Sequence, residues 1–169
     1  MSQSHILIVE DEEKIARFIE LELRHEGYKV IKANNGRDGL EIAERGEADL
    51  VILDVMLPEI NGLEVLRRLR KTSDIPVIML TARGEEQDEL FGFELGVDEY
   101  ISKPFSPKIL VARVEAILKR TNQTQSFAKD YGGIELDKNY IIAKYVLTES
   151  DYTQPVNGKV KENEHSKSA

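Results

Sequence analysis

The feature that most constrains the fold is an alternation of short apolar runs with helix-like patterns along the first 120 residues. Each run has five or six residues, as expected of a buried strand, and each is followed by a segment with helical spacing of its apolar residues. Apolar strands separated by helices form a parallel sheet that is covered on both faces. The sequence therefore predicts five strands, at residues 5–9, 28–33, 49–53, 76–80 and 98–102.

The segments between these runs predict the helices. Apolar residues recur at helical spacing in 15–23 and again in 110–118, and a weaker helix is expected at 86–95. The polar residues at 34–36 and 61–62 can begin two further helices. The fold class is therefore α/β, with a five-stranded parallel sheet that is doubly wound and flavodoxin-like in its broad class.

Composition narrows the class of protein. The formal net charge of −8 argues against a nucleic-acid surface spread over the chain, because such a surface needs clustered Lys and Arg. The chain has no cysteine, which excludes disulfides and thiolate metal sites. No apolar run approaches the roughly 20 residues of a membrane span, and residues 1–5 lack the features of a secretory signal. We expect a cytoplasmic protein without a membrane partner.

The chain changes character after Arg120, which we take as the end of the first domain at 1–120. Residues 121–130 are predicted to be a polar linker. Two short strands are expected within 131–145, around the turn residues 137–139, and residues 157–169 are expected to be disordered.

Polar residues with compatible chemistry occur at four of the predicted strand ends. Glu10 and Asp11 follow the first strand, Asp54 the third, Thr81 the fourth and Lys103 the fifth. Open α/β sheets bind their ligands beyond the carboxyl ends of the strands. Three carboxylates there form an oxygen cluster suited to Mg²⁺, and their mutual repulsion is a reason to expect a metal. A carboxylate, a divalent cation, a hydroxyl and an ammonium together suit phosphoryl transfer.

Each of these residues alone has a more ordinary interpretation. The run Glu10 to Glu12 is more often a solvated helix start, and a single strand-end Asp is more often a turn or capping residue than a nucleophile. A lone Thr or Lys at a strand end is more often structural. The functional interpretation depends on finding residues with compatible chemistry at all four strand ends of one domain.

Four segments in the same order, 6–12, 53–58, 79–82 and 102–105, resemble the successive motifs of receiver domains of two-component response regulators. The resemblance covers residues 5–120 without an apparent gap. It implies that Asp54 accepts a phosphoryl group from a sensor histidine kinase, and that the protein is a phosphoacceptor switch rather than an enzyme. It also implies Mg²⁺ as cofactor, with the ligands Glu10, Asp11, Asp54 and the backbone carbonyl of Met56.

The resemblance assigns further roles around the site. Thr81 and Lys103 would hold the phosphoryl oxygens, and Tyr100 matches an aromatic switch position that moves inward when Thr81 is drawn to the phosphate. Tyr100 is otherwise an ordinary residue of an amphipathic strand. The peptide bond between Lys103 and Pro104 matches a cis bond of the family. Glu10 stands where Asp is commoner, and its longer side chain should still reach the cation.

Residues 96–108 resemble the subgroup of response regulators that carry a winged-helix DNA-binding domain and regulate transcription. Residues 131–137 look like the opening strand of that domain, and then the match stops. No later stretch has the periodicity or the basic residues of a recognition helix. We therefore predict that 131–169 is a truncated or diverged effector and that this chain does not bind DNA specifically by itself; DNA is a partner only where a complete effector is present.

The surface that forms homodimers in this subgroup, across the fourth helix, fifth strand and fifth helix, departs from the usual pattern. Glu99 and Arg113 match one of its charged pairs. Glu89 stands where a basic residue is usual, and Ile109 where its acidic partner is usual. The departures indicate either drift on a solvated surface or a dimer that is weaker, more apolar or replaced by another partner.

Two other functions compete with the phosphoacceptor switch. Hydrolases with an aspartyl nucleophile combine the same groups with Mg²⁺, but typically carry a second acid two residues after the nucleophile, where this chain has Met56. A phosphate-independent interaction module is the other alternative, and the retention of every reactive position argues against it.

Overall fold

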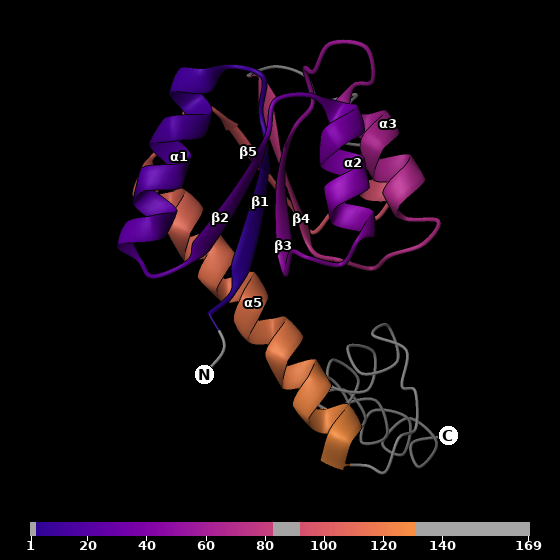
Figure 1. Cartoon of the computed structure of the whole chain (residues 1–169). Coiled ribbons are helices and arrows are strands. Elements are labelled where there is room, and N and C mark those ends of the chain that lie inside the picture. Colours follow the sequence, from indigo (N-terminus) through magenta and orange to yellow (C-terminus); the bar gives the residue numbers. More distant parts are fainter. Residues whose placement is uncertain (1–2, 83–91, 131–169) are drawn as a thin grey trace, which may run out of the picture. The chain divides into compact units, whose positions relative to one another are not determined.

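Five parallel strands form one sheet in the order β2-β1-β3-β4-β5 (Figure 1). The computed structural model describes residues 3–82 and 92–130 of the chain. This arrangement confirms the predicted fold class. The strands are β1 His5–Val9, β2 Lys29–Ala33, β3 Leu50–Asp54, β4 Val77–Ala82 and β5 Glu99–Lys103.

The last three strands extend one or two residues further than predicted. Asp54 pairs with Leu80 and Ala82 pairs with Lys103, so the backbone ladder includes the polar residues that the prediction left outside the strands. Backbone hydrogen bonding does not depend on the polarity of the side chain, whereas the sequence signal did. Asp54, Thr81 and Lys103 are consequently mounted on strand backbone rather than on loops, whereas Glu10 and Asp11 follow β1.

Helices connect the strands: α1 Glu13–His25, α2 Gly36–Glu44, α3 Gly62–Leu69 and α5 Pro107–Asp130. The predicted capping residues function as caps, since Asn35 accepts a hydrogen bond from the Asp38 backbone N–H at 2.8 Å and Asn61 accepts one from that of Glu64 at 2.9 Å. Most of the helix predicted at 86–95 lies outside the described residues, and residues 92–94 are helical.

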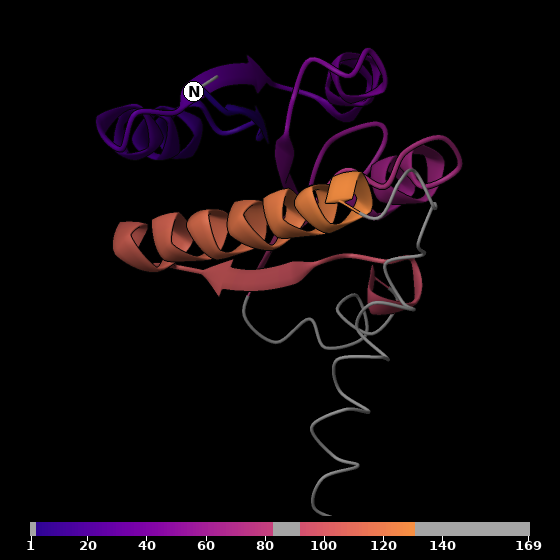
Figure 2. The ribbon, with the colours of Figure 1, turned by 90° about the horizontal axis from the view of Figure 1, so that it is seen from below.

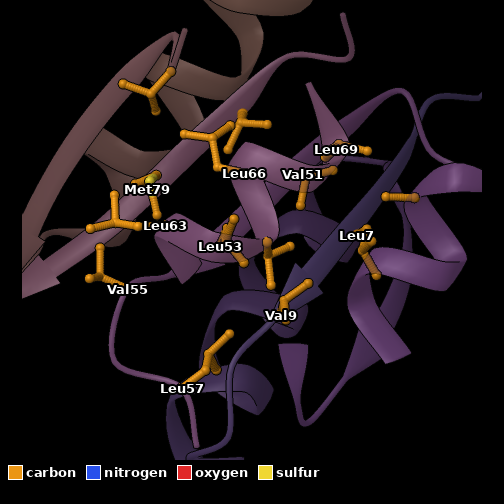
Figure 3. Close-up of a cluster of buried hydrophobic side chains, with 14 of the residues drawn as sticks. Leu7, Val9, Val51, Leu53, Val55, Leu57, Leu63, Leu66, Leu69 and Met79 are labelled. Carbon is orange, nitrogen blue, oxygen red and sulfur yellow. The ribbon is translucent and has the colours of Figure 1, made fainter. Parts of the chain in front are cut away.

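Helices cover both faces of the sheet, with α1 and α5 on one face and α2 and α3 on the other (Figure 1). Side chains alternate along each strand, so Ile6 and Ile8 pack toward α1 and α5 while Leu7 and Val9 pack toward α2 and α3. Figure 3 shows the second of these clusters, in which Leu63 and Leu66 of α3 lie among strand side chains. Every residue of β3 is buried, so the central strand is fixed on both faces.

Residues 121–130, which the sequence predicts to be a polar linker, continue the helix α5. No glycine or proline follows Pro107 within α5, so nothing in the sequence ends the helix at Arg120. Figure 2 shows the first part of α5 alongside β5, where Arg113 lies 3.8 Å from Glu99. The chain divides into two compact units, Met1–Arg120 and Thr121–Ala169. The strands and disorder predicted in 131–169 lie outside the described residues.

None of the helices in the described parts of the chain is long and apolar enough to cross a membrane.

Candidate functional site: an acidic cluster at the carboxyl edge of the sheet

The residues predicted from the strand ends converge on one lysine. The ammonium of Lys103, the last residue of β5, lies 2.8 Å from Oε2 of Glu10 and 2.9 Å from Oδ2 of Asp54. Glu10 directly follows β1 and Asp54 ends β3, and these strands are neighbours in the sheet. Lys103 thus meets two residues that are distant in the sequence, Glu10 at a separation of 93 positions and Asp54 at a separation of 49.

Three carboxylates are close enough to share a cation. One oxygen from each of Glu10, Asp11 and Asp54 lies within 4.8 Å of the other two. Glu10 and Asp54 are buried, with 2% and 3% of their surface exposed, whereas Asp11 is exposed. Hard oxygen donors with one open, solvent-facing side are the donor set that Mg²⁺ prefers, because this ion keeps several of its waters. The residues present fit the expected cofactor.

Backbone amides hold the two buried carboxylates in place. The N–H of Met56 donates to Oδ1 of Asp54 at 3.1 Å, and the N–H of Glu12 donates to Oε1 of Glu10 at 3.1 Å. Each carboxylate thus has one oxygen on a backbone amide and the other on Lys103. Met56 itself, by contrast, is 61% exposed.

The charges of the cluster are incompletely compensated. Burial, the largest influence, raises the pKa of Glu10 from 4.5 to about 7, and the neighbouring Asp54 adds to the rise against the hydrogen bonds from Lys103 and the Glu12 amide. Burial alone would lower the pKa of Lys103, but its hydrogen bonds to Glu10 and Asp54 and their charges raise it. The cluster holds three carboxylates and one ammonium, which contacts two of them, so a further cation is electrostatically favoured.

Thr81 and Tyr100 lie on the adjacent strands β4 and β5. Thr81 is fully buried in β4, and its backbone is paired with that of Ser102 in β5. The half-buried Tyr100 contacts Phe93, with ring centroids 5.0 Å apart in an edge-to-face arrangement. Their predicted roles as phosphoryl donor and switch remain predictions. The Lys103–Pro104 peptide bond is cis, as the resemblance implies.

Two charged residues of the predicted dimer surface form an ion pair within one chain. Arg113 on α5 lies 3.8 Å from Glu99 on β5, and both are at least partly exposed. Ile109 and Phe93 are 53% and 57% exposed, which leaves apolar area on this side of the domain. Glu89 lies outside the described residues. Dimerisation itself stays a prediction.

Sequence reasoning missed one contact that organises the site, the ion pair between Glu10 and Lys103. Lys103 was expected to hold a phosphoryl oxygen. The sequence did carry a signal for this contact, namely the glutamate at position 10, where aspartate is commoner in the family. A glutamate has one more methylene than an aspartate and so reaches further into the site.

A doubly wound α/β domain with three carboxylates, a lysine and a buried threonine at the carboxyl ends of its strands defines the receiver class of signalling domains. Comparison with known proteins agrees. The family model described as "Response regulator receiver domain" matches residues 6–115. The chain belongs to this family and is therefore a protein of two-component signal transduction.

Similar proteins include the response regulator ArlR of Staphylococcus aureus, which is 46% identical over 154 residues, covering 88% of this chain and 69% of ArlR. Among solved structures, a putative response regulator from Chloroflexus aurantiacus is 39% identical with a TM-score of 0.66, covering 70% of this chain and 99% of that one. A CheY-like receiver domain from Methanospirillum hungatei is 30% identical with a TM-score of 0.70, covering 73% and 99%.

Proposed function

We propose that Asp54 accepts a phosphoryl group from a sensor histidine kinase and that this modification switches the receiver. The observation that carries the proposal is the environment of the Asp54 carboxylate. It is buried at the end of the central strand, held by the Met56 amide and by Lys103, and grouped with Glu10 and Asp11 within 4.8 Å. A buried carboxylate held in a fixed orientation is suited to nucleophilic attack on a phosphoryl group.

Glu10, Asp11, Asp54 and the backbone carbonyl of Met56 would hold Mg²⁺ at this site. Bound there, the cation would offset the charge of the carboxylates and of the phosphoryl oxygens. The carboxylate donors are within reach of one another, and the exposed position of Asp11 leaves one side open for water and a phosphodonor.

Side chains of the protein would stabilise the transferred group. The Lys103 ammonium already bridges Glu10 and Asp54, so a small displacement would place it on a phosphoryl oxygen. The Thr81 hydroxyl would donate to a second phosphoryl oxygen. The Met56 amide orients Asp54 through Oδ1. We assign the protein no turnover of an external substrate beyond self-phosphorylation from small phosphodonors and self-dephosphorylation.

The switch would run from Thr81 to Tyr100. Movement of the buried Thr81 side chain toward the phosphate would vacate space beside β5, into which the Tyr100 ring could move. Such a two-state rearrangement converts a local charge change into an altered surface. Glu99 on β5 and Arg113 on α5 would transmit this change of the surface to a partner protein or to a second copy of the chain.

The output we propose is transcriptional control in a full-length relative. The match to ArlR covers 88% of this chain and so extends beyond Arg120. The winged-helix subgroup itself is proposed from the resemblance of residues 96–108. DNA binding would require a complete effector domain, and we expect none from residues 1–169 alone.

The direct test is acylphosphate formation with acetyl phosphate as donor, read by intact-protein mass spectrometry. We expect the mass of one phosphoryl group to be added in Mg²⁺ and not in EDTA. Asp54→Asn should abolish the label, whereas Asp49→Asn, an exposed aspartate that precedes β3, should keep it. Absence of label in the wild-type protein would instead favour the phosphate-independent interaction module, and a label retained by Asp54→Asn would move the acceptor elsewhere.

A further inference from the structure

The loop that follows Asp54 is held at two points where backbone approaches glycine so closely that no side chain would fit. The loop comprises residues 55–61 and includes Met56, whose amide binds Asp54. One contact is made by Gly62, the first residue of α3, and the other by Gly36, the first residue of α2. Both glycines are buried.

Gly62 packs directly on the backbone of the phosphoacceptor. A Cβ atom at Gly62 would overlap the carbonyl oxygen of Asp54, and it would lie only 2.9 Å from the Asp54 carbonyl carbon and from Cα of Val55. The Gly62 amide also donates to the carbonyl of Val55 at 2.9 Å. The atoms in conflict belong to the backbone at the end of β3 and the start of the loop, so they cannot rotate away as a side chain would.

Gly36 supports the loop from α2. A Cβ atom there would lie 2.5 Å from the carbonyl oxygen of Ile60 and 2.9 Å from Cγ2 of Val65. Between the two contacts the loop is tightly folded, with Leu57 donating to the Val55 carbonyl at 3.1 Å and Glu59 in the left-handed region at a φ of 63°. The buried side chains of Val55 and Leu57 anchor the backbone on either side of Met56 (Figure 3).

We propose that Gly62 and Gly36 are positioning residues for phosphoryl transfer, which clamp the loop so that the Asp54 carboxylate and the Met56 backbone keep the geometry that the reaction needs. The proposal rests on the phosphoacceptor role of Asp54. Neither glycine would touch the phosphodonor. Each acts by excluding a side chain, and an added methyl group would displace the loop by a substantial fraction of an ångström. Displacements of that size are enough to slow a reaction that depends on in-line geometry.

The test compares three alanine variants of buried glycines under saturating Mg²⁺ and acetyl phosphate. Gly39 supplies the matched control, because it lies on α2 with Gly36 and is equally crowded, but the three atoms nearest a Cβ there, at 2.6, 2.7 and 3.2 Å, belong to the side chain of Val9 and not to the loop. We expect Gly62→Ala and Gly36→Ala to lower the labelling rate constant by about ten- to a hundredfold, while Gly39→Ala stays within about twofold of the wild type. Thermal unfolding of each variant shows whether the losses exceed those caused by reduced stability.

The outcomes separate the two proposals. A wild-type protein that is not labelled would overturn the phosphoacceptor role and this inference with it. A labelled wild type, with Gly36→Ala and Gly62→Ala no slower than an equally destabilised Gly39→Ala, would overturn the inference alone. Should Gly62→Ala fail to fold, Gly36→Ala decides, since its added methyl group presses on the loop without contacting Asp54. Slow labelling with an unchanged Mg²⁺ dissociation constant would assign the effect to the orientation of the Asp54 carboxylate for attack rather than to metal binding.

Discussion

Two buried glutamates in this domain have opposite electrostatic surroundings. Glu20, on the inner face of α1, accepts hydrogen bonds from Arg17 and Arg24, each at 3.0 Å, and lies 3.1 Å from the Lys32 ammonium. Glu10, at the end of β1, shares the ammonium of Lys103 with Asp54. Glu20 thus has three cations around it, one of which, Lys32, also lies 3.1 Å from the exposed Glu13. At the site, by contrast, two buried carboxylates share one cation.

The pKa values follow this difference. Burial alone would raise the pKa of Glu20, but hydrogen bonds and charges from Lys32 and Arg17 lower it below its ordinary value of 4.5. At Glu10 burial prevails and the pKa rises to about 7. The network around Glu20 is complete within the protein and serves the fold. The cluster around Glu10 lacks positive charge, and such a deficit is expected where a cation and a phosphodonor are to bind.

Removal of Lys103 should have the largest effect, because it takes away the single cation of the deficient cluster. We expect Lys103→Met to lower the free energy of unfolding by about 2–3 kcal/mol at pH 8 in EDTA, since two buried carboxylates then face each other uncompensated. Urea unfolding measures the change. Lys29→Met, at an exposed position on β2, is the matched control. Added Mg²⁺ should restore more stability to Lys103→Met than it adds to the wild type. Equal stability of the two proteins in EDTA would contradict the deficit of positive charge at the site.

The affinity for Mg²⁺ should depend on pH through Glu10. The carboxylate must release its proton to act as a ligand, and its pKa in the folded protein is about 7. We therefore expect the Mg²⁺ association constant to fall about tenfold between pH 8 and pH 6. Isothermal titration at several pH values measures it, with Glu10→Gln as the reference whose affinity should be weaker but flatter with pH. A wild-type affinity that does not change over this range would exclude Glu10 as the titrating ligand.

Substitution of Glu10 itself should stabilise the metal-free protein. A glutamate whose folded pKa is raised costs the folded state stability as the pH rises from 4.5 through about 7, because folding then opposes the loss of the proton. Glu10→Gln removes this cost, and we expect a gain on the order of 1 kcal/mol at pH 8 in EDTA, a modest amount because the substitution also takes one charged partner from Lys103. The gain should shrink toward pH 4.5. A loss of stability at pH 8 would mean that Lys103 already compensates the carboxylate.

The same contrast explains what the sequence could and could not predict. Periodicity was enough for the fold, and the rule that ligands bind at the carboxyl ends of parallel strands was enough to group Glu10, Asp54 and Lys103. The Glu20 network was not predictable, since Glu20 occupies a position on the buried face of α1, between Ile19 and Leu23, and its partner Lys32 comes from another element. The helical course of 121–130 was missed because polar composition is common to linkers and to solvated helices.

The smallest effect is expected at Glu20, with the opposite sign to Glu10. Because the pKa of Glu20 is lowered on folding, its contribution to stability is present above pH 4.5 and is lost as the pH falls through the folded value. Glu20→Gln should therefore cost about 0.5–1 kcal/mol at pH 7, a modest amount because Arg17 and Arg24 are more than half exposed and screened by water. Urea unfolding at pH 7 and in acid measures the cost, which should vanish in acid. Labelling of Asp54 should be unaffected. If Glu20→Gln instead stabilised the protein at pH 7, as we expect Glu10→Gln to do at pH 8, the two glutamates would not differ in their electrostatic surroundings.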